Sequence, residues 1–563
     1  MFIQTKERFY IFFILLVSFL LVFDLFFNKG HSAHMDGRAH ITTITQFYLA
    51  IKSGDLKPTW ADGFANYGMP VPLVAHQFIS YLGAWMTFIT HNAIVSWKIV
   101  ALIATVLSNL ILYKFLRIYF KQIPSTVAIF LYNISPYRIL NLYVREALPE
   151  FFASVFFPLV LFALYYLIKE KKRWAIILLA ISFTGLALSH PMMMVVASFI
   201  IFPYLLFLLK DEKEKIKKLF LTGVSMGWGL LMAAYYLIPL NIEIKYFYYG
   251  SGNHLTQGQT LHLKNFIDPN WYYYFDRDVL NRGHFVTPGL FEVIILVIGI
   301  LYLVRRIMIA KKWKVDMLDI AVFVGVTSLF LTTDYALIFY EKINILSNIQ
   351  FPWRMLSLFI FVPPIIIAYI LNKFENNKLK IAALTLIVAF AFLRFPQLYS
   401  KNNTDHPLSQ YLFTKINLHS TNMNTIWTGI TDDYPVKRQK GEIIEGQGKI
   451  VSRELSNSWR KYAVNAITDI RMADYTFYFP GWKVWVDSKP VDIQFQDPNY
   501  RGIITYNVPK GRHNIYLKFT DTKVRVLGNL VSALSIAGLI IFFFVEKKKH
   551  ILKRFFDFPG NQN

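Results

Sequence analysis

The sequence predicts a polytopic α-helical membrane protein of about 12 transmembrane helices, with a small β-sandwich-like domain before the last helix. Three observations lead to this prediction. The 563 residues are 55% hydrophobic and only 17% charged, whereas soluble domains carry about 25% charged residues. Apolar runs of bilayer-spanning length, about 17–25 residues, recur along the chain. Near residue 440 they give way to alternating polar and apolar residues. The composition rules out a disordered chain and disfavours a wholly soluble enzyme.

Each predicted span is a nearly continuous apolar run. The spans lie near residues 9–27, 94–113, 124–141, 146–168, 174–190, 192–210, 219–240, 289–304, 316–333, 353–371, 380–396 and 526–545. The segment 76–90 is apolar but short, so we expect an interfacial or re-entrant helix there rather than another crossing.

Basic residues predict the orientation of the spans, because positively charged loops stay in the cytoplasm. Seven groups of Lys and Arg hold 27 of the 59 basic residues, and all seven fall on one side of a twelve-span protein. Both termini are therefore expected in the cytoplasm. The first span is expected to be a retained anchor, because no small-residue cleavage site follows it.

The distribution of basic residues also explains the net charge of +24. A surplus of this size can indicate binding to nucleic acid, a membrane surface or an acidic ligand. Because so many basic residues lie in the predicted cytoplasmic loops, they indicate contact with anionic membrane lipids, and we exclude nucleic acid as a partner. The absence of cysteine excludes disulfides, a thiolate nucleophile and cysteine zinc sites.

The first outer segment, 28–93, begins with a predicted amphipathic helix. Residues 39–52 place five apolar side chains on one helical stripe, which is typical of a helix lying on the membrane surface. These side chains are Ile41, Ile44, Phe47, Tyr48 and Ile51. A second outer segment covers residues 241–288.

The third outer segment, 397–525, changes from a linker to a predicted antiparallel β-domain at about residue 440. Alternation predicts strands at residues 482–486, 492–495, 502–508 and 514–519. We therefore divide the chain into a transmembrane domain (1–396), a linker and β-domain (397–525), and a final helix with a basic cytoplasmic tail (526–563).

Ionisable and polar aromatic residues gather near the predicted outer ends of the spans, and no comparable group lies midway. The members with the clearest chemistry are Arg138, Arg145, Glu146, Glu150, His190, Trp353 and Arg354. Because Glu146 and Glu150 are four residues apart, we expect them to share a helix face. Since buried charges in membranes usually mark function, this pattern favours a polar cavity open to the outer leaflet.

These residues also have structural interpretations. The arginines could be interfacial anchors near lipid phosphates, the glutamates could pair with them, and Trp353 with Arg354 could belong to an interface belt. A second group crowds before the first outer helix, at His31, His34, Asp36, Arg38 and His40. A divalent cation held by its histidines and Asp36 is one interpretation, although the spacing matches no zinc motif.

Several stretches carry a resemblance to a known family. They are HMDGRAH with GDLKPTWADGFANYGMPV, SPYRILNLYVREALPEFFASVFFPL, LALSHPMM, IQFPWRML, and YFPGWKVWVDSKPV with VPKGRHNIYLKF. These stretches follow one another in this order over nearly the whole chain. On this ground the chain resembles the YfhO-like bacterial membrane proteins. Some of these are labelled as related to 6-pyruvoyl-tetrahydropterin synthase, and they belong to the GT-C glycosyltransferase superfamily. The label implies no pterin chemistry here.

The resemblance implies a GT-C-like fold in a bacterial cell membrane, with an extracytoplasmic active site. It implies transfer of a sugar from a polyprenyl-phosphate donor to an acceptor such as a cell-envelope glycopolymer. Asp36 takes the place of the family's acidic residue in the first outer loop, which implies a general base. The candidates for the donor phosphate are Arg138, Arg145, Arg354 and His190. The residues expected to contact substrate are His34, Arg38, Glu146, Glu150 and Trp353. No cofactor is implied firmly, and a divalent cation stays open.

Two other functions remain open at this stage. Twelve spans also suit a lipid or glycan transporter or flippase, although midplane charges and repeated halves are absent from the sequence. A non-catalytic cell-envelope assembly factor is the other alternative. In that case Trp482, Trp485 and Tyr506 of the β-domain would stack on sugar rings.

Overall fold

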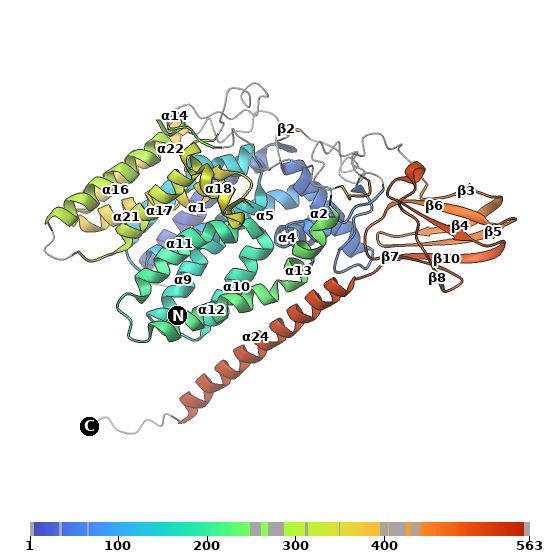
Figure 1. The fold of residues 1–563 in the computed structure, drawn as a ribbon. Coiled ribbons are helices and arrows are strands. Elements are labelled where there is room, and N and C mark those ends of the chain that lie inside the picture. Colours follow the sequence, from blue (N-terminus) through green and yellow to red (C-terminus); the bar gives the residue numbers. More distant parts are fainter. Residues whose placement is uncertain are drawn as a thin grey trace.

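The structure is a computed structural model, and it describes residues 5–32, 36–64, 67–247, 260–267, 286–309, 313–347, 349–394, 403–404, 424–428 and 439–556. A helical domain is followed by a β-domain, and a long last helix, α24 (Lys523–Phe556), runs from the β-domain back along the helical domain (Figure 1).

The predicted apolar segments are largely helical. Their principal helices are α1 (Thr5–Phe27), α5 (Ala93–Leu116), α6 (Gln122–Asn133), α8 (Leu148–Ala153), α9 (Phe156–Ile168), α10 (Trp174–Ser189), α11 (Pro191–Leu209), α12 (Lys215–Met232), α13 (Ala234–Glu243), α16 (Leu290–Ile309), α17 (Met317–Thr332), α20 (Leu356–Phe359), α21 (Val362–Lys373), α22 (Asn377–Arg394) and α24. Among the described residues, six helical stretches are long and apolar enough to cross a membrane, or seven if α12 and α13, bent by 73°, form one span. The count of about 12 spans therefore stays a prediction.

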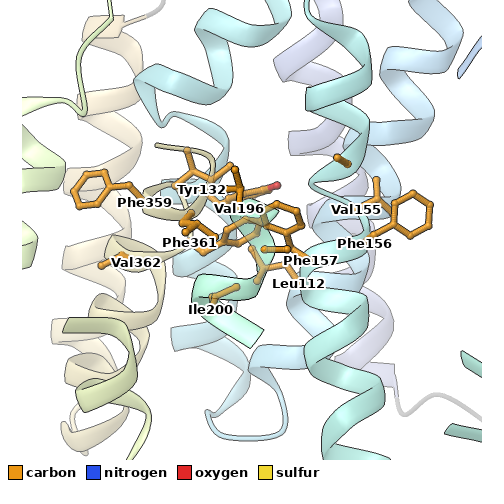
Figure 2. Close-up of a cluster of buried hydrophobic side chains, with 14 of the residues drawn as sticks. Leu112, Tyr132, Val155, Phe156, Phe157, Val196, Ile200, Phe359, Phe361 and Val362 are labelled. Carbon is orange, nitrogen blue, oxygen red and sulfur yellow. The ribbon is translucent and has the colours of Figure 1, made fainter. Parts of the chain in front are cut away.

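Aromatic and aliphatic side chains from several of these helices form the core of the helical domain. Figure 2 shows Leu112 of α5, Tyr132 of α6, Phe157 of α9, Ile200 of α11 and Phe361 beside α21 around one centre. The rings of Tyr132 and Phe361 stack with their centroids 5.1 Å apart. Close van der Waals packing of these side chains holds the helices together, because lipid tails are as apolar as the side chains and supply little hydrophobic driving force between spans.

Polar contacts connect the predicted cytoplasmic loops at one end of the helical domain. The contacting pairs are Glu7–Arg117, Lys121–Asn372, Lys169–Glu212, Arg173–Glu546 and Lys210–Val315. The β-domain lies at the opposite end, and α24 connects the two ends (Figure 1). The structure thus places at one end the loops that the positive-inside rule assigns to one side of the membrane. Which end faces the cytoplasm stays a prediction.

The first outer segment forms two short helices that pack on each other, α2 (Gly37–Lys52) and α4 (Gln77–Thr90). The apolar stripe of α2 is buried in the protein, with Ile41, Ile44 and Phe47 fully covered. Gly83 of α4 allows this close approach, because an added Cβ would lie 2.6 Å from the Ile44 side chain. The prediction of a helix was right, but its placement on the membrane surface was wrong, because α4 and α5 cover its apolar face.

The β-domain consists of two antiparallel sheets that share one core. One has the order β4–β5–β10–β7–β8 and the other β3–β6–β9. The strands are β3 (Gly441–Glu445), β4 (Gly448–Leu455), β5 (Trp459–Ala466), β6 (Ile470–Phe477), β7 (Trp482–Val486), β8 (Lys489–Val491), β9 (Ile503–Val508) and β10 (Gly511–Phe519). Three of the predicted strands correspond to β7, β9 and β10. The fourth, 492–495, forms only a single bridge between Gln494 and Thr505.

The β-domain and the first outer segment share a hydrophobic core. Trp60 is fully buried, and its ring centroid lies 5.2 Å from that of Trp482 and 5.0 Å from that of Phe519. Tyr67 stacks on Phe477 at 4.8 Å. Trp482 and Tyr506 are core residues, so neither is free to stack on a sugar.

Two ion pairs, each with a buried arginine, help to hold the β-domain on the rest of the protein. Asp62 of the first outer segment pairs with Arg460 of β5 and lies 3.1 Å from Lys440. At the base of the domain, Glu243 accepts a 2.8 Å hydrogen bond from Arg525 of α24. Because buried charges are costly when one partner is missing, these pairs fix how the β-domain sits on the helical domain.

We predict that Trp60→Ala loosens the contact between the β-domain and the first outer segment. Truncating a fully buried tryptophan costs about 3–5 kcal/mol of stability. Thermal unfolding and limited proteolysis of the detergent-solubilised protein should both report this loss. Trp85→Ala is the matched control, because Trp85 is 53% exposed in the same outer segment. Equal effects of the two variants would contradict the shared core.

Candidate functional site

An unusual stretch of backbone builds the centre of the site. The short helix α7 (Pro136–Ile139) continues into a π-helical turn, Leu140–Val144. The Arg145 amide donates to the Leu140 carbonyl at 2.8 Å, and Glu146 follows with φ of +51°. Left-handed backbone is strained for a residue other than glycine, and both features are frequent at functional sites. The sequence Leu148-Pro149 then opens α8.

This backbone turns the two glutamates in different directions. Glu150 faces Arg145, whereas Glu146 faces His31, whose Nδ1 lies 3.2 Å from a Glu146 carboxylate oxygen. Both members of the His31–Glu146 pair are about 1% exposed. The prediction that Glu146 and Glu150 share a helix face was wrong, because the helix is interrupted between them.

Glu150 is the centre of a buried polar cluster. Its carboxylate accepts hydrogen bonds from four side chains, and a second arginine lies close by. The hydrogen-bond donors are Tyr137, Asn141 (3.2 Å), Arg145 (3.0 Å) and Ser357 (2.9 Å). Arg354 Nε is 3.4 Å from the same carboxylate. Two guanidinium groups thus share one anion, a geometry in which the arginines are held before any ligand arrives.

Arg145 connects this cluster to the first outer segment. Its guanidinium lies over the ring of Trp353 at 4.4 Å and donates to Asn141 at 2.5 Å. Its other end nitrogen, Nη2, is 4.0 Å from the Asp36 carboxylate. Trp353 is buried in this contact rather than exposed in an interface belt.

Asp36 stands immediately before α2, where the chain meets the π-helical turn. Its amide donates to the Arg145 carbonyl at 2.9 Å, and its carbonyl accepts from the His40 amide at 3.0 Å. The carboxylate makes no capping hydrogen bond to α2 and is 49% exposed. Its backbone is therefore held while its carboxylate stays accessible next to a buried arginine.

Three histidines lie in a column beside Asp36. The His76 ring stacks on His190 at 4.6 Å, and the His40 ring is 6.1 Å from that of His76. The Nδ1 atoms of His76 and His190 are buried without a hydrogen-bond partner in the described part of the chain. Burial, followed by the charge of Arg145, lowers the pKa of His40 to about 3. Burial, followed by the neighbouring His40, lowers the pKa of His76 to about 3.

Arg138 lines one small cavity with Glu150, but its hydrogen bonds go to other side chains. Its guanidinium is stacked between the rings of Tyr132 and Phe151, at 4.2 and 4.5 Å, and donates to hydroxyl groups, among them Ser108 at 2.8 Å. It is 1% exposed. Its contacts are therefore with core side chains rather than with Glu150 or Asp36, and the predicted contact of this arginine with a donor phosphate stays a prediction.

Arg38 and His34 were also predicted to contact substrate. Arg38 is exposed on α2, and His34 lies outside the described residues. Asn141, Ser357 and His76 belong to the site but were not predicted, because a single polar residue in or beside an apolar run carries no distinguishing signal. Among the residues that the structure describes, no group of three or more metal-ligating side chains is placed to hold a metal ion. The proposed divalent-cation set is therefore not assembled by its described members, His31, Asp36 and His40.

Comparison with protein families gives one finding. Residues 77–402 match the family of membrane proteins described as having a 6-pyruvoyl-tetrahydropterin synthase related domain. This region is more than half of the chain and includes Arg145, Glu150 and Arg354. Asp36 and the β-domain lie outside it. A search of curated proteins finds no match.

We predict that Gly37→Ala disturbs the site next to Asp36. An added Cβ would lie 1.7 Å from a Glu146 carboxylate oxygen, so the buried His31–Glu146 pair must move. The expected loss of stability is about 1–3 kcal/mol, as for other overpacked positions, measured by thermal unfolding. Gly223→Ala on α12 is the control, because nothing lies within 4 Å of its added Cβ. The site packing would be refuted if Gly37→Ala proved as stable as this control.

The lowered pKa values of His40 and His76 predict that acid destabilises the fold. In the unfolded chain both titrate near about 6.5, so between about pH 6.5 and 3 the unfolded state binds more protons. The free energy of unfolding should fall as the pH falls through this range. Denaturant unfolding at about pH 7.5 and about pH 5 measures the slope. His40→Gln/His76→Gln should flatten it relative to the wild type, and an unchanged slope would contradict the burial of neutral imidazoles.

Proposed function

The chain belongs to the family of 6-pyruvoyl-tetrahydropterin synthase related membrane proteins, and on this premise we propose that it is a GT-C-type membrane glycosyltransferase. It moves a sugar from a polyprenyl-phosphate donor to an extracytoplasmic acceptor in the cell envelope. The observation that carries the proposal is the accessible Asp36 carboxylate, 4.0 Å from an arginine that Glu150 holds in the protein interior.

Asp36 is the general base of this reaction. As the acceptor hydroxyl attacks the anomeric carbon, its proton passes to the Asp36 carboxylate, the new carbon–oxygen bond forms, and the bond from the sugar to the phosphate oxygen breaks. The leaving group is polyprenyl phosphate. A base must reach the attacking oxygen, and a half-exposed carboxylate on a fixed backbone meets this requirement.

Arg145 and Arg354 stabilise the negative charge that develops on the leaving phosphate. Both side chains are held by Glu150, and the Nε atom of Arg145 lacks a hydrogen-bond partner in the described chain. Donors fixed in a buried site stabilise developing charge without having to reorganise. His190 faces the same region with its unpartnered Nδ1, and is proposed as a further donor to the phosphate or sugar.

We predict that Asp36→Asn abolishes sugar transfer, because the amide cannot accept the proton. A general base contributes about 10²–10⁴-fold to the rate. Mass spectrometry of cell-envelope glycopolymers and polyprenyl-phosphate sugars, in cells with and without the protein, identifies donor and acceptor together. Cells with Asp36→Asn should accumulate the lipid-linked sugar beside an under-decorated polymer.

Lys52→Gln is the matched control, because Lys52 is exposed in the last turn of α2, the helix that begins directly after Asp36. This variant should support wild-type decoration, and the two variants should be present in the membrane in equal amounts. Normal decoration by Asp36→Asn would remove Asp36 from the mechanism. Lipid movement by the reconstituted protein without any glycosyl transfer would instead favour a transporter or flippase.

A further inference from the structure

The outer face of the five-stranded sheet carries a row of side chains that the core does not use. Strand register places Trp485 of β7 opposite Tyr516 of β10, which is opposite Lys461 of β5, which is opposite Glu454 of β4. Directly opposed residues share one face of a sheet. Their chain neighbours, such as Leu517, point into the core. The row therefore faces away from the second sheet.

Two aromatic rings form one wall of a groove on this face. Trp485 and Tyr516 are partly exposed, and their rings stack with centroids 5.7 Å apart and an angle of 28°. The groove has a volume of about 690 Å³, and its polar lining includes Ser452, Lys461 and Asn514. Pockets for small ligands have volumes of about 300–1,000 Å³. The groove thus has room for several sugar units.

The turn between β7 and β8 is held in a strained conformation at the rim of this groove. Asp487 and Ser488 have φ of +47° and +67°, and both line the groove. The Asn514 amide donates to the Asp487 carboxylate at 2.8 Å, and His513 Nδ1 is 2.6 Å from it. A two-residue hairpin turn favours Asn, Asp or Gly at the first of these positions and Gly at the second, so Ser488 is the unusual residue. The anchoring by β10 instead fixes a carboxylate and a hydroxyl beside the aromatic wall.

Basic residues outnumber acidic ones on the outer face around the groove, although Glu454 and Asp487 both line the groove itself. Strands β4, β5, β7 and β10 contain one acidic residue, Glu454. The same register places five exposed basic residues on the outer face: Lys449, Lys461, Lys483, Arg512 and Lys518. Only Lys461 of these five has an ion pair among the described residues, at 3.3 Å from Glu454. The face is therefore complementary to an anionic ligand.

We propose that this face binds a negatively charged glycopolymer. The C–H face of a sugar ring packs on the electron-rich face of Trp485 or Tyr516, the polar groove lining bonds its hydroxyls, and the surrounding lysines attract its anionic groups. A groove with an aromatic wall suits a polymer chain better than a flat lipid surface. Binding itself is independent of the proposed transfer reaction. That the bound polymer is the sugar acceptor rests on the proposed function.

The test uses the full-length protein in nanodiscs of zwitterionic lipid, with four probes. Polygalacturonate is the anionic polysaccharide, dextran the neutral one, inorganic polyphosphate supplies charge without sugar, and phosphatidylglycerol vesicles represent a membrane. Trp485→Ala/Tyr516→Ala removes the aromatic wall, and Lys483→Gln/Lys518→Gln removes two charges. Tyr335→Ala is the matched control, because Tyr335 is 71% exposed outside the β-domain.

The wild type and Tyr335→Ala should bind polygalacturonate more tightly than dextran. The aromatic variant should lose about 10-fold or more in affinity for polygalacturonate, about 1.4 kcal/mol, and bind polyphosphate as the wild type does. The lysine variant should show a weaker dependence of binding on salt. Thermal unfolding establishes that the variants are folded. If the aromatic variant unfolds, the lysine variant alone decides the outcome.

Three results would overturn the proposal. The first is that the wild type fails to bind polygalacturonate. The second is that both double variants bind polygalacturonate with the affinity and salt dependence of the wild type. The third is that the wild type binds only the phosphatidylglycerol vesicles. The test is separable from that of the transfer reaction. Asp36→Asn should bind polygalacturonate normally, so binding without transfer in the wild type would refute the glycosyltransferase and leave this inference intact.

Discussion

The buried carboxylate of Glu150 is the interaction on which the site depends. A charge inside an apolar bundle is tolerated only with partners, and loss of one partner costs more than the pair contributes. Glu150 meets this constraint with Arg145, five residues away, and Arg354, more than 200 residues away. The ion pairs therefore hold the turn before α8 against the entrance to α20. The same carboxylate orders Tyr137, Asn141 and Ser357 around it.

The first outer segment connects this buried cluster to the β-domain. At its start, the Asp36 amide bonds to the Arg145 carbonyl. Farther along, Trp60, Asp62 and Tyr67 are part of the contact with the β-domain. The segment is thus held from two sides. The proposed general base and the proposed glycopolymer face belong to structures that meet through this one segment.

The helices and strands that the sequence predicts correctly are those whose residue pattern lies within one short stretch of the chain. An apolar run predicts a helix wherever it packs, and alternation predicts a strand, as in β7, β9 and β10. The pattern of 492–495 also alternates, but the chain there forms a single β-bridge, between Gln494 and Thr505, instead of a strand. The stripe on α2 correctly predicted its apolar face. Periodicity, however, does not distinguish a lipid surface from a protein surface, and α4 covers that face.

In the site, too, the sequence pattern and the tertiary packing determine different features. The sequence by itself determined that charged and aromatic residues gather at the ends of apolar helices, and this was enough to select Arg145, Glu150, His190, Trp353 and Arg354, whereas Asp36 was selected through the resemblance to a known family. Only the tertiary structure decided which residues meet: Glu146 turns to His31, Arg138 points to hydroxyl groups in the core, and His76 joins His190. The physical reason is that burial, a π-helical turn and a left-handed residue set the direction of each side chain. These depend on the packing of distant segments rather than on residue spacing.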